Sequence, residues 1–184
     1  GKCSFAVLES DESDKSLLNY SSDYALVLNI GTDQYSKDEL ARVFREFLKK
    51  VRKGAVVELG AFELIGEAGL ENLDIRLFSL EKGPGKAFGR SVLRLDSYRT
   101  ESGRALASFG GLREIALPGP GLHNAANAMA VFSLLLQLGY EPDNALEAVK
   151  GFSGVWRRFE FAGRCASGAP VYDDYAHNVE KMLS

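Results

Sequence analysis

Cysteine, histidine and tryptophan are scarce in this sequence of 184 residues, which has two cysteines, two histidines and one tryptophan. Cys3 and Cys165 are far apart, and neither lies in a Cys-x-x-Cys pair. This spacing argues against a zinc knuckle and against a disulfide framework. We therefore expect two free thiols in a reducing compartment.

Long apolar runs and an excess of charge of one sign are also absent. The longest apolar stretch, residues 131–138, contains Ser133 and Gln137 and is far shorter than the ~20 residues that span a bilayer. The first ten residues lack the basic region and apolar core of a signal peptide. The net charge of −3 gives none of the basic surface that duplex nucleic acid requires. We expect a cytoplasmic protein that binds neither membranes nor nucleic acid.

Short apolar runs alternate with helical patterns along the chain. This order favours an α/β fold with a mainly parallel central sheet flanked by helices. The apolar spacing predicts strands at 5–8, 24–28, 55–58 and 75–80, and helices at 37–53, 62–70, 123–138 and 143–150.

Two segments carry more specific signals. Ser36 and Glu39 form an S-x-x-E capping box at the start of the helix predicted over 37–53. Residues 91–117 are short β segments joined by tight turns, which predicts a small antiparallel subsheet.

The C-terminal residues have the pattern of a strand, a loop and one helical turn. We expect a domain over 1–163, the start of a second domain over 164–184, and a fold truncated at both ends. The open sheet edge that truncation leaves would favour self-association.

An acidic cluster follows the first predicted strand, at Glu9, Asp11, Glu12 and Asp14. Open α/β sheets bind ligands beyond the carboxyl ends of their strands. Carboxylate oxygens there would suit Mg²⁺ and the phosphates of a nucleotide. A solvated acidic loop would have the same composition, so both interpretations stay open.

Polar side chains open the apolar helix predicted over 123–138. His123, Asn124 and Asn127 follow a Gly-Pro-Gly run, and the two asparagines are three residues apart, which places them on one face. Such amides can cap the helix, or they can supply the paired donor and acceptor that bind an adenine edge.

Two further motifs lie near the C-terminus. In GVWRRFE, one of Arg157 and Arg158 could contact a phosphate while the neighbouring aromatic rings anchor the segment, or it could form an ion pair with Glu160 or a neighbour. In VYDDYAHN, residues 171–178, two carboxylates, a ring and an imidazole could contact a ribose and a base, or form an interdomain linker.

Together, ESDESD, NI-x-x-D, HNAANAMA, GVWRRFE and DDYAHN occur in an order that resembles the Mur ligase family, over about residues 9–178. The resemblance implies an ATP-dependent ligase of peptidoglycan synthesis, in which ATP phosphorylates a carboxylate and an amine attacks the acyl phosphate. The substrates it implies are ATP, UDP-N-acetylmuramate and L-alanine, with a murein peptide as the alternative amine.

The resemblance also implies roles for individual residues, with ATP and Mg²⁺ as the cofactors. Glu9 would be a Mg²⁺ ligand, and Arg158 would approach the ATP phosphates. The base and ribose would be bound by His123, Asn124, Asn127, Asp173 or Asp174, Tyr175 and His177.

The sequence also departs from the family pattern. No Gly-Lys-Thr phosphate loop occurs, and we expect the chain to begin after that loop and to be inactive alone. Gln34 follows Asp33 where the family has histidine, and His177 is followed by Asn178 and Val179 instead of His-Pro. Two function classes therefore stay open: the ATPase domain of a working ligase, and a degenerate homologue that acts as a binding module.

Overall fold

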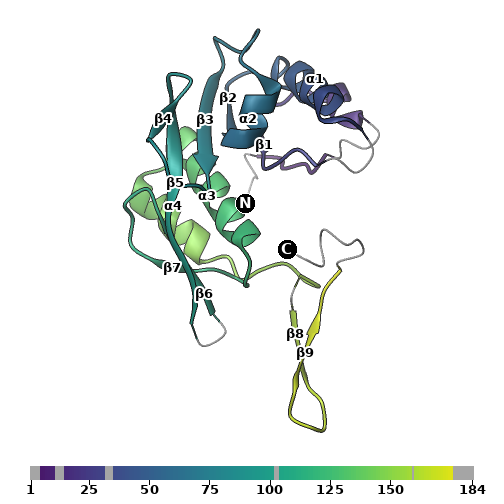
Figure 1. The fold of residues 1–184 in the computed structure, drawn as a ribbon, viewed down its shortest axis with the longest axis vertical. Coiled ribbons are helices and arrows are strands. Elements are labelled where there is room, and N and C mark those ends of the chain that lie inside the picture. Colours follow the sequence, from purple (N-terminus) through teal and green to yellow (C-terminus); the bar gives the residue numbers. More distant parts are fainter. Residues whose placement is uncertain (1–4, 11–14, 32–34, 102–103, 159, 176–184) are drawn as a thin grey trace. The chain divides into compact units, whose positions relative to one another are not determined.

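The computed structural model describes residues 5–10, 15–31, 35–101, 104–158 and 160–175. These residues form two compact units. The first unit comprises residues 1–77 and 86–92, and the second comprises residues 78–85 and 93–184. Figure 1 shows the helices and strands of both units. In the described residues, no helix is long and apolar enough to cross a bilayer.

The first unit is an α/β layer. Its elements are η1 (Ser16–Asn19), β1 (Tyr24–Val27), α1 (Lys37–Leu48), β2 (Gly54–Glu58), α2 (Leu59–Ile65), β3 (Asp74–Ser79, whose last two residues belong to the second unit), β4 (Lys86–Ala87) and the start of β5 (Arg90–Glu101). β1 and β2 pair in parallel, from Tyr24 opposite Gly54 to Val27 opposite Val57. β4 pairs antiparallel with β5.

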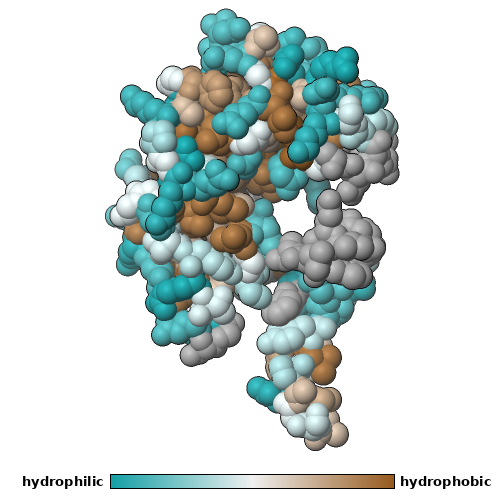
Figure 2. Space-filling view, in the orientation of Figure 1, coloured by the Kyte–Doolittle hydropathy of each residue, from teal (hydrophilic) through white to brown (hydrophobic). Residues whose placement is uncertain are grey.

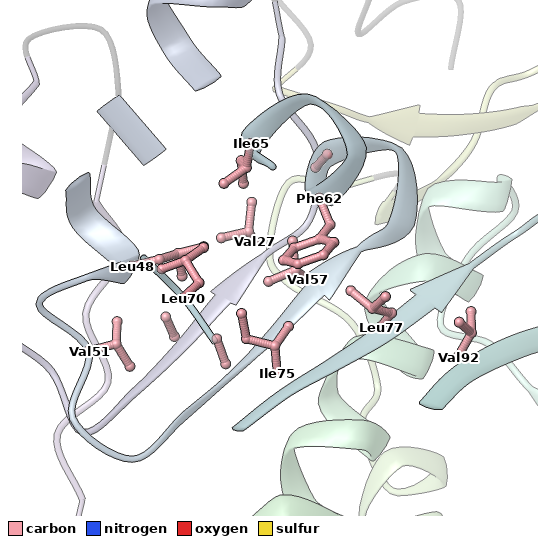
Figure 3. Packing of buried hydrophobic residues seen from close by; sticks show 13 residues of the cluster. Val27, Leu48, Val51, Val57, Phe62, Ile65, Leu70, Ile75, Leu77 and Val92 are labelled. Atoms are coloured by element: carbon pink, nitrogen blue, oxygen red, sulfur yellow. The ribbon is translucent and has the colours of Figure 1, made fainter. Parts of the chain in front are cut away.

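A continuous apolar cluster holds the first unit together. Alternate residues of the strands face α1 and α2, and Phe62 of α2 points down onto Val57 of β2 (Figure 3). Each fully buried valine, leucine, isoleucine or phenylalanine side chain contributes about 1.5–3 kcal/mol to the stability of the fold, because it is removed from water. The cluster also contains Val27, Leu48, Val51, Ile65, Leu70, Ile75, Leu77 and Val92.

The capping box of α1 forms in part. The Ser36 side chain accepts the Glu39 N–H at 3.2 Å, as predicted. The Glu39 carboxylate, however, pairs with Lys15 Nζ at 2.7 Å. The helix ends at Leu48 and not at residue 53, because the following backbone bonds to the segment before β1: the Arg52 N–H donates to the Ser22 carbonyl.

The helix predicted over 62–70 is wrong in its bounds. α2 begins at Leu59, where the Glu58 carboxylate accepts the Ala61 N–H at 2.8 Å. It ends at Ile65 because Gly66, expected inside the helix, has a φ of +72°. Glycine adopts this conformation at no steric cost, so it terminates helices readily.

The second unit contains the rest of β5, β6 (Arg104–Phe109), β7 (Ile115–Ala116), α3 (Leu122–Gln137), α4 (Pro142–Lys150), β8 (Glu160–Arg164) and β9 (Pro170–Asp173). β5, β6 and β7 pair antiparallel in that order, as predicted for 91–117. The Phe109 and Phe132 rings lie 5.5 Å apart and join β6 to α3. The strand order β1-β2-β3-β5-β6-β7 gives one mixed sheet with a parallel and an antiparallel part, which confirms the predicted fold class.

Two predictions at the ends of the described chain are wrong or incomplete. Residues 5–8 are not a strand, and Phe5, Val7 and Leu8 are 58%, 98% and 63% exposed. No strand of the described residues pairs with them, and an apolar run becomes a strand only when a neighbour takes its backbone hydrogen bonds. The strand expected near residue 170 is present as β9, but its antiparallel partner β8 was not predicted.

Candidate functional site

The start of α3 is fixed by a glycine turn and a tyrosine. Gly121 is the N-cap, with a φ of +102° and no side-chain cap. Its N–H donates to the Tyr98 hydroxyl of β5 at 2.7 Å. A Cβ at position 121 would overlap the His123 imidazole, so only glycine lets the ring lie there.

Neither asparagine caps α3. Asn124 Nδ2 donates to the Pro120 carbonyl at 2.8 Å, so its amide braces the preceding turn. The side chains of His123 and Asn127 are exposed, and neither has a hydrogen-bond partner among the residues that the structure describes. An exposed amide with unused donors and acceptors on a braced helix end is able to bind a ligand that presents both groups.

Arg157 and Arg158 have different surroundings. Arg157 Nε lies 3.5 Å from Asp173 Oδ2, and its N–H donates to Glu160 Oε2 at 2.9 Å. Arg158 is exposed, and within the described ranges its guanidinium has no ion pair; it lies 6.0 Å from the centre of the Tyr175 ring. The Arg157 guanidinium therefore pairs with Asp173, Glu160 accepts only the Arg157 backbone N–H, and the Arg158 charge is available to an anion.

The acidic pair of DDYAHN lies at the end of β9. Asp173 is the last residue of the strand and pairs with Arg157, while Asp174 and Tyr175 follow it and are exposed. The Tyr175 N–H donates to the Arg157 carbonyl at 2.9 Å. His177 lies outside the described residues.

One close approach links the segment before the arginines to the turn before α3. A Cβ at Gly154 would lie 3.5 Å from Pro118 Cβ. The second unit therefore brings two predicted motifs, GPGLHN and GVWRRFE, into one neighbourhood.

The predicted metal site is described only in part. Glu9 belongs to the first unit, is exposed and has no partner among the described side chains. Asp11, Glu12, Asp14, Asp33 and Gln34 fall outside the described ranges. In those ranges, no group of three histidine, cysteine or acidic side chains is close enough to hold a metal.

Cys165 lies in the loop that joins β8 to β9. It is a free, exposed thiol, as predicted, whereas Cys3 lies outside the described residues. Its sulfur lies 3.0 Å from Ser167 Oγ, and this hydrogen bond lowers the pKa of the Cys165 thiol below its usual value.

Two residues of the site were missed by the sequence reasoning. Tyr98 and the Arg157 backbone act through contacts between segments far apart in the chain, and no local pattern marks them. The two adjacent arginines were the only local pattern that pointed to this part of the site. That pattern does not predict which arginine forms an ion pair and which does not.

No family model matches the chain. Over its whole length it is 34% identical to the UDP-N-acetylmuramate–L-alanine ligase of Mycobacterium sp. (strain JLS), and it spans 39% of that protein. The UDP-N-acetylmuramate–alanine ligase of Thermotoga maritima covers 94% of the chain with a TM-score of 0.72 and 26% identity, and the chain spans 39% of that structure. The chain is therefore similar, along its whole length, to about two fifths of a Mur ligase.

A second solved Mur ligase has the same fold. The MurF ligase of Thermotoga maritima in complex with ADP covers 88% of this chain with a TM-score of 0.62 and 18% identity, and the chain spans 37% of it. The resemblance inferred from the sequence motifs is therefore confirmed at the level of the family and the fold.

Proposed function

We propose that this chain forms the ATP-binding part of a ligase that joins L-alanine to the carboxylate of UDP-N-acetylmuramate. Residues 1–163 would be the central ATP-binding domain and residues 164–184 the start of the C-terminal domain. The observation that carries the proposal is the 34% identity to an L-alanine ligase along the whole chain. The side chains of Asn127 and Arg158, both within the motifs, support it, because they have no hydrogen bond or ion pair with another described residue.

The proposed reaction has two steps. The carboxylate of the sugar acid attacks the γ-phosphorus of ATP, which gives an acyl phosphate and ADP. The amine of L-alanine then attacks the acyl carbon, an amide bond forms, and inorganic phosphate leaves. Catalysis of phosphoryl transfer consists mainly of positioning and charge neutralisation, so arginine and backbone donors are the relevant groups.

The nucleotide would be bound by side chains of the second unit. Asn127, with His123 and Asn124 beside it, would bind the adenine edge. Arg158 would contact the phosphates, because its guanidinium is exposed and unpaired in the described chain.

The ribose and the rim of the base site would be formed by the end of β9. Asp173 uses Oδ2 for Arg157, which leaves Oδ1 for a ribose hydroxyl, and Asp174 is the alternative. Tyr175 and His177 would border the base or the phosphates.

Glu9 is chemically suited to Mg²⁺. Magnesium is held in such enzymes by one or two carboxylates with phosphate oxygens and water completing its shell, so a single free carboxylate fits. When bound, the ion would neutralise the charge that develops on the transferred phosphoryl group. Glu9 would contribute one oxygen ligand and keep it available, since no described cation pairs with it.

A chimeric ligase tests the proposal. Residues 1–184 would replace the matching region of the Mycobacterium ligase, and amide formation would be followed with UDP-N-acetylmuramate, Mg·ATP and L-alanine. We expect activity, a loss of about a hundredfold or more in kcat for Arg158→Ala, and a higher KM for ATP with Asn127→Ala. Arg164→Ala, in the exposed hairpin, is the matched control and should leave activity unchanged.

The outcomes separate the alternatives. Activity with a murein tripeptide in place of L-alanine would assign the recycling reaction instead. A folded chimera that binds no ATP would favour the degenerate homologue, and full activity of the Arg158→Ala chimera would contradict the proposed role of that residue.

A further inference from the structure

Arg157 has a left-handed backbone conformation, with a φ of +58°. Residues other than glycine rarely adopt it, because the side chain crowds the backbone. Such a conformation persists where the surrounding contacts hold it, and it is concentrated at binding and catalytic sites. The contacts of Arg157 therefore indicate which parts of the structure hold its backbone in this conformation.

The Arg157 backbone joins the two ends of the β8–β9 hairpin. Its N–H donates to the Glu160 carboxylate at the first residue of β8, at 2.9 Å. Its carbonyl accepts the N–H of Tyr175, two residues beyond the end of β9, also at 2.9 Å. One residue thereby fixes where the chain enters the hairpin and where it leaves.

The Arg157 side chain adds three contacts to the same place. Its Nε lies 3.5 Å from Asp173 Oδ2. The guanidinium carbon lies 5.1 Å from the centre of the Tyr175 ring and 5.5 Å from the centre of the Trp156 ring, which are cation–π distances. A planar guanidinium can pair with a carboxylate through its edge while its flat face lies over a ring, whereas an ammonium is a point charge without such a face.

These contacts leave the neighbouring groups open to a ligand. Trp156 and Tyr175 remain 76% and 53% exposed, and Arg158 lies 6.0 Å from the Tyr175 ring without an ion pair in the described chain. The surface of the β8–β9 hairpin carries hydrophobic as well as hydrophilic residues (Figure 2). The hairpin's own ladder already pairs Glu160 with Asp173, so the contacts of Arg157 are additional to those that form the hairpin.

We propose that Arg157 is a positioning residue, which holds Tyr175 and Asp173 at the base and ribose while its neighbour Arg158 contacts the phosphates. The inference rests on the proposed nucleotide site and adds to it a residue that does not itself touch the phosphates. Binding of the base and ribose would then depend on Arg157, and binding of the phosphates would depend on Arg158.

Two probes and three variants test this division. Mg·ATP presents base, ribose and phosphates, whereas adenosine lacks the phosphates. Arg157→Gly removes the side chain but tolerates the positive φ, Arg157→Lys keeps only the charge, and Arg158→Ala removes the second guanidinium. Dissociation constants would be measured on the purified chain through the fluorescence of Trp156, its only tryptophan, and checked by NMR titration.

We expect Arg157→Gly to raise the Kd of both probes about fivefold, because the variant loses a ring contact and an ion pair that hold the binding residues in place. Arg158→Ala should raise the Kd of Mg·ATP about tenfold and leave that of adenosine unchanged. Arg157→Lys should resemble Arg157→Gly, because the ammonium does not reproduce the stacked geometry.

Failure of the two proposals can be told apart. If the unaltered chain binds both probes and Arg157→Gly leaves adenosine affinity unchanged, the positioning role is wrong and the nucleotide site stands. If Arg157→Gly lowers only the melting temperature, Arg157 has a structural role alone. If the unaltered chain binds neither probe, the nucleotide site and the role of Arg157 in it are both overturned.

Discussion

Gly121 and Gly139 flank α3 and both have a left-handed backbone, with φ of +102° and +88°. Each Gly→Ala substitution should cost about 1–2 kcal/mol of stability, because a Cβ is disfavoured there. Only at Gly121 would the Cβ also meet the His123 ring, which can rotate away; at Gly139 nothing lies within 4 Å. We therefore expect similar losses in urea unfolding, but weaker Mg·ATP binding for Gly121→Ala alone. If the two variants bind Mg·ATP equally well, His123 does not contribute to nucleotide binding.

Asp23 gives stability a dependence on acid pH. Arg52 Nε donates to its Oδ1 at 2.9 Å and Lys53 lies 3.4 Å away, and the hydrogen bond with Arg52 is the main reason that the pKa of the Asp23 carboxyl lies below 3.8. When folding lowers the pKa of a carboxyl group, the group stabilises the fold at every pH above its pKa in the unfolded chain. This contribution is lost as the pH falls through the pKa of the folded chain. Arg52→Gln should shift the NMR titration midpoint of Asp23 back towards 3.8. An unchanged midpoint would show that the ion pair is not populated in solution.

Residue types in the motifs were sufficient to name candidate polar groups, but not to predict the partners of these groups. The structure leaves the side chains of Asn127 and Arg158 exposed, and their roles in binding stay predictions. Which arginine is free depends on Asp173 and Tyr175, which are 15 or more residues away in sequence, and neither periodicity nor spacing contains that information.

The N-terminus of α1 tests the energetics of a single element. The Ser36 hydroxyl accepts the Glu39 N–H, so Ser36→Ala should destabilise the chain by about 1 kcal/mol in urea unfolding. Ser36→Thr keeps the acceptor and should retain most of the stability. Glu39→Gln removes a partly buried ion pair with Lys15, and its smaller effect should weaken in high salt. A Ser36→Ala chain as stable as the original would show that the cap contributes nothing.

Elements with long periodic patterns were predicted well, and those that depend on distant partners were not. α1 and α3 follow from apolar spacing, and the antiparallel strands follow from their turns. Residues 5–8 have the composition of a buried strand but are exposed, because a strand is completed by its neighbour. β8 was missed for the opposite reason: it pairs with β9 although its residues show little burial pattern.

At the scale of the whole molecule, the exposed run at residues 5–8 bears on self-association. Self-association was predicted from an open sheet edge and stays a prediction, which sedimentation velocity over a range of concentrations would check. Val7→Glu should reduce association if this run is the contact, since a charge placed at a 98% exposed apolar position costs little in the monomer and more in an interface.

The isolated chain should fold but not turn over ATP. Its 184 residues contain no Gly-Lys-Thr run, so it has no lysine placed for the β- and γ-phosphates and no hydroxyl placed for the metal. Arg158 and Glu9 alone would neutralise only part of the charge that develops in phosphoryl transfer, and positioning provides most of the rate. We expect phosphate release from the purified chain to stay at background with L-alanine and UDP-N-acetylmuramate present, while the chimeric ligase is active under the same conditions. Ligation by the purified chain would mean that the phosphate contacts come from residues within it, and the search for them would begin with Arg157, Arg158 and the start of α3.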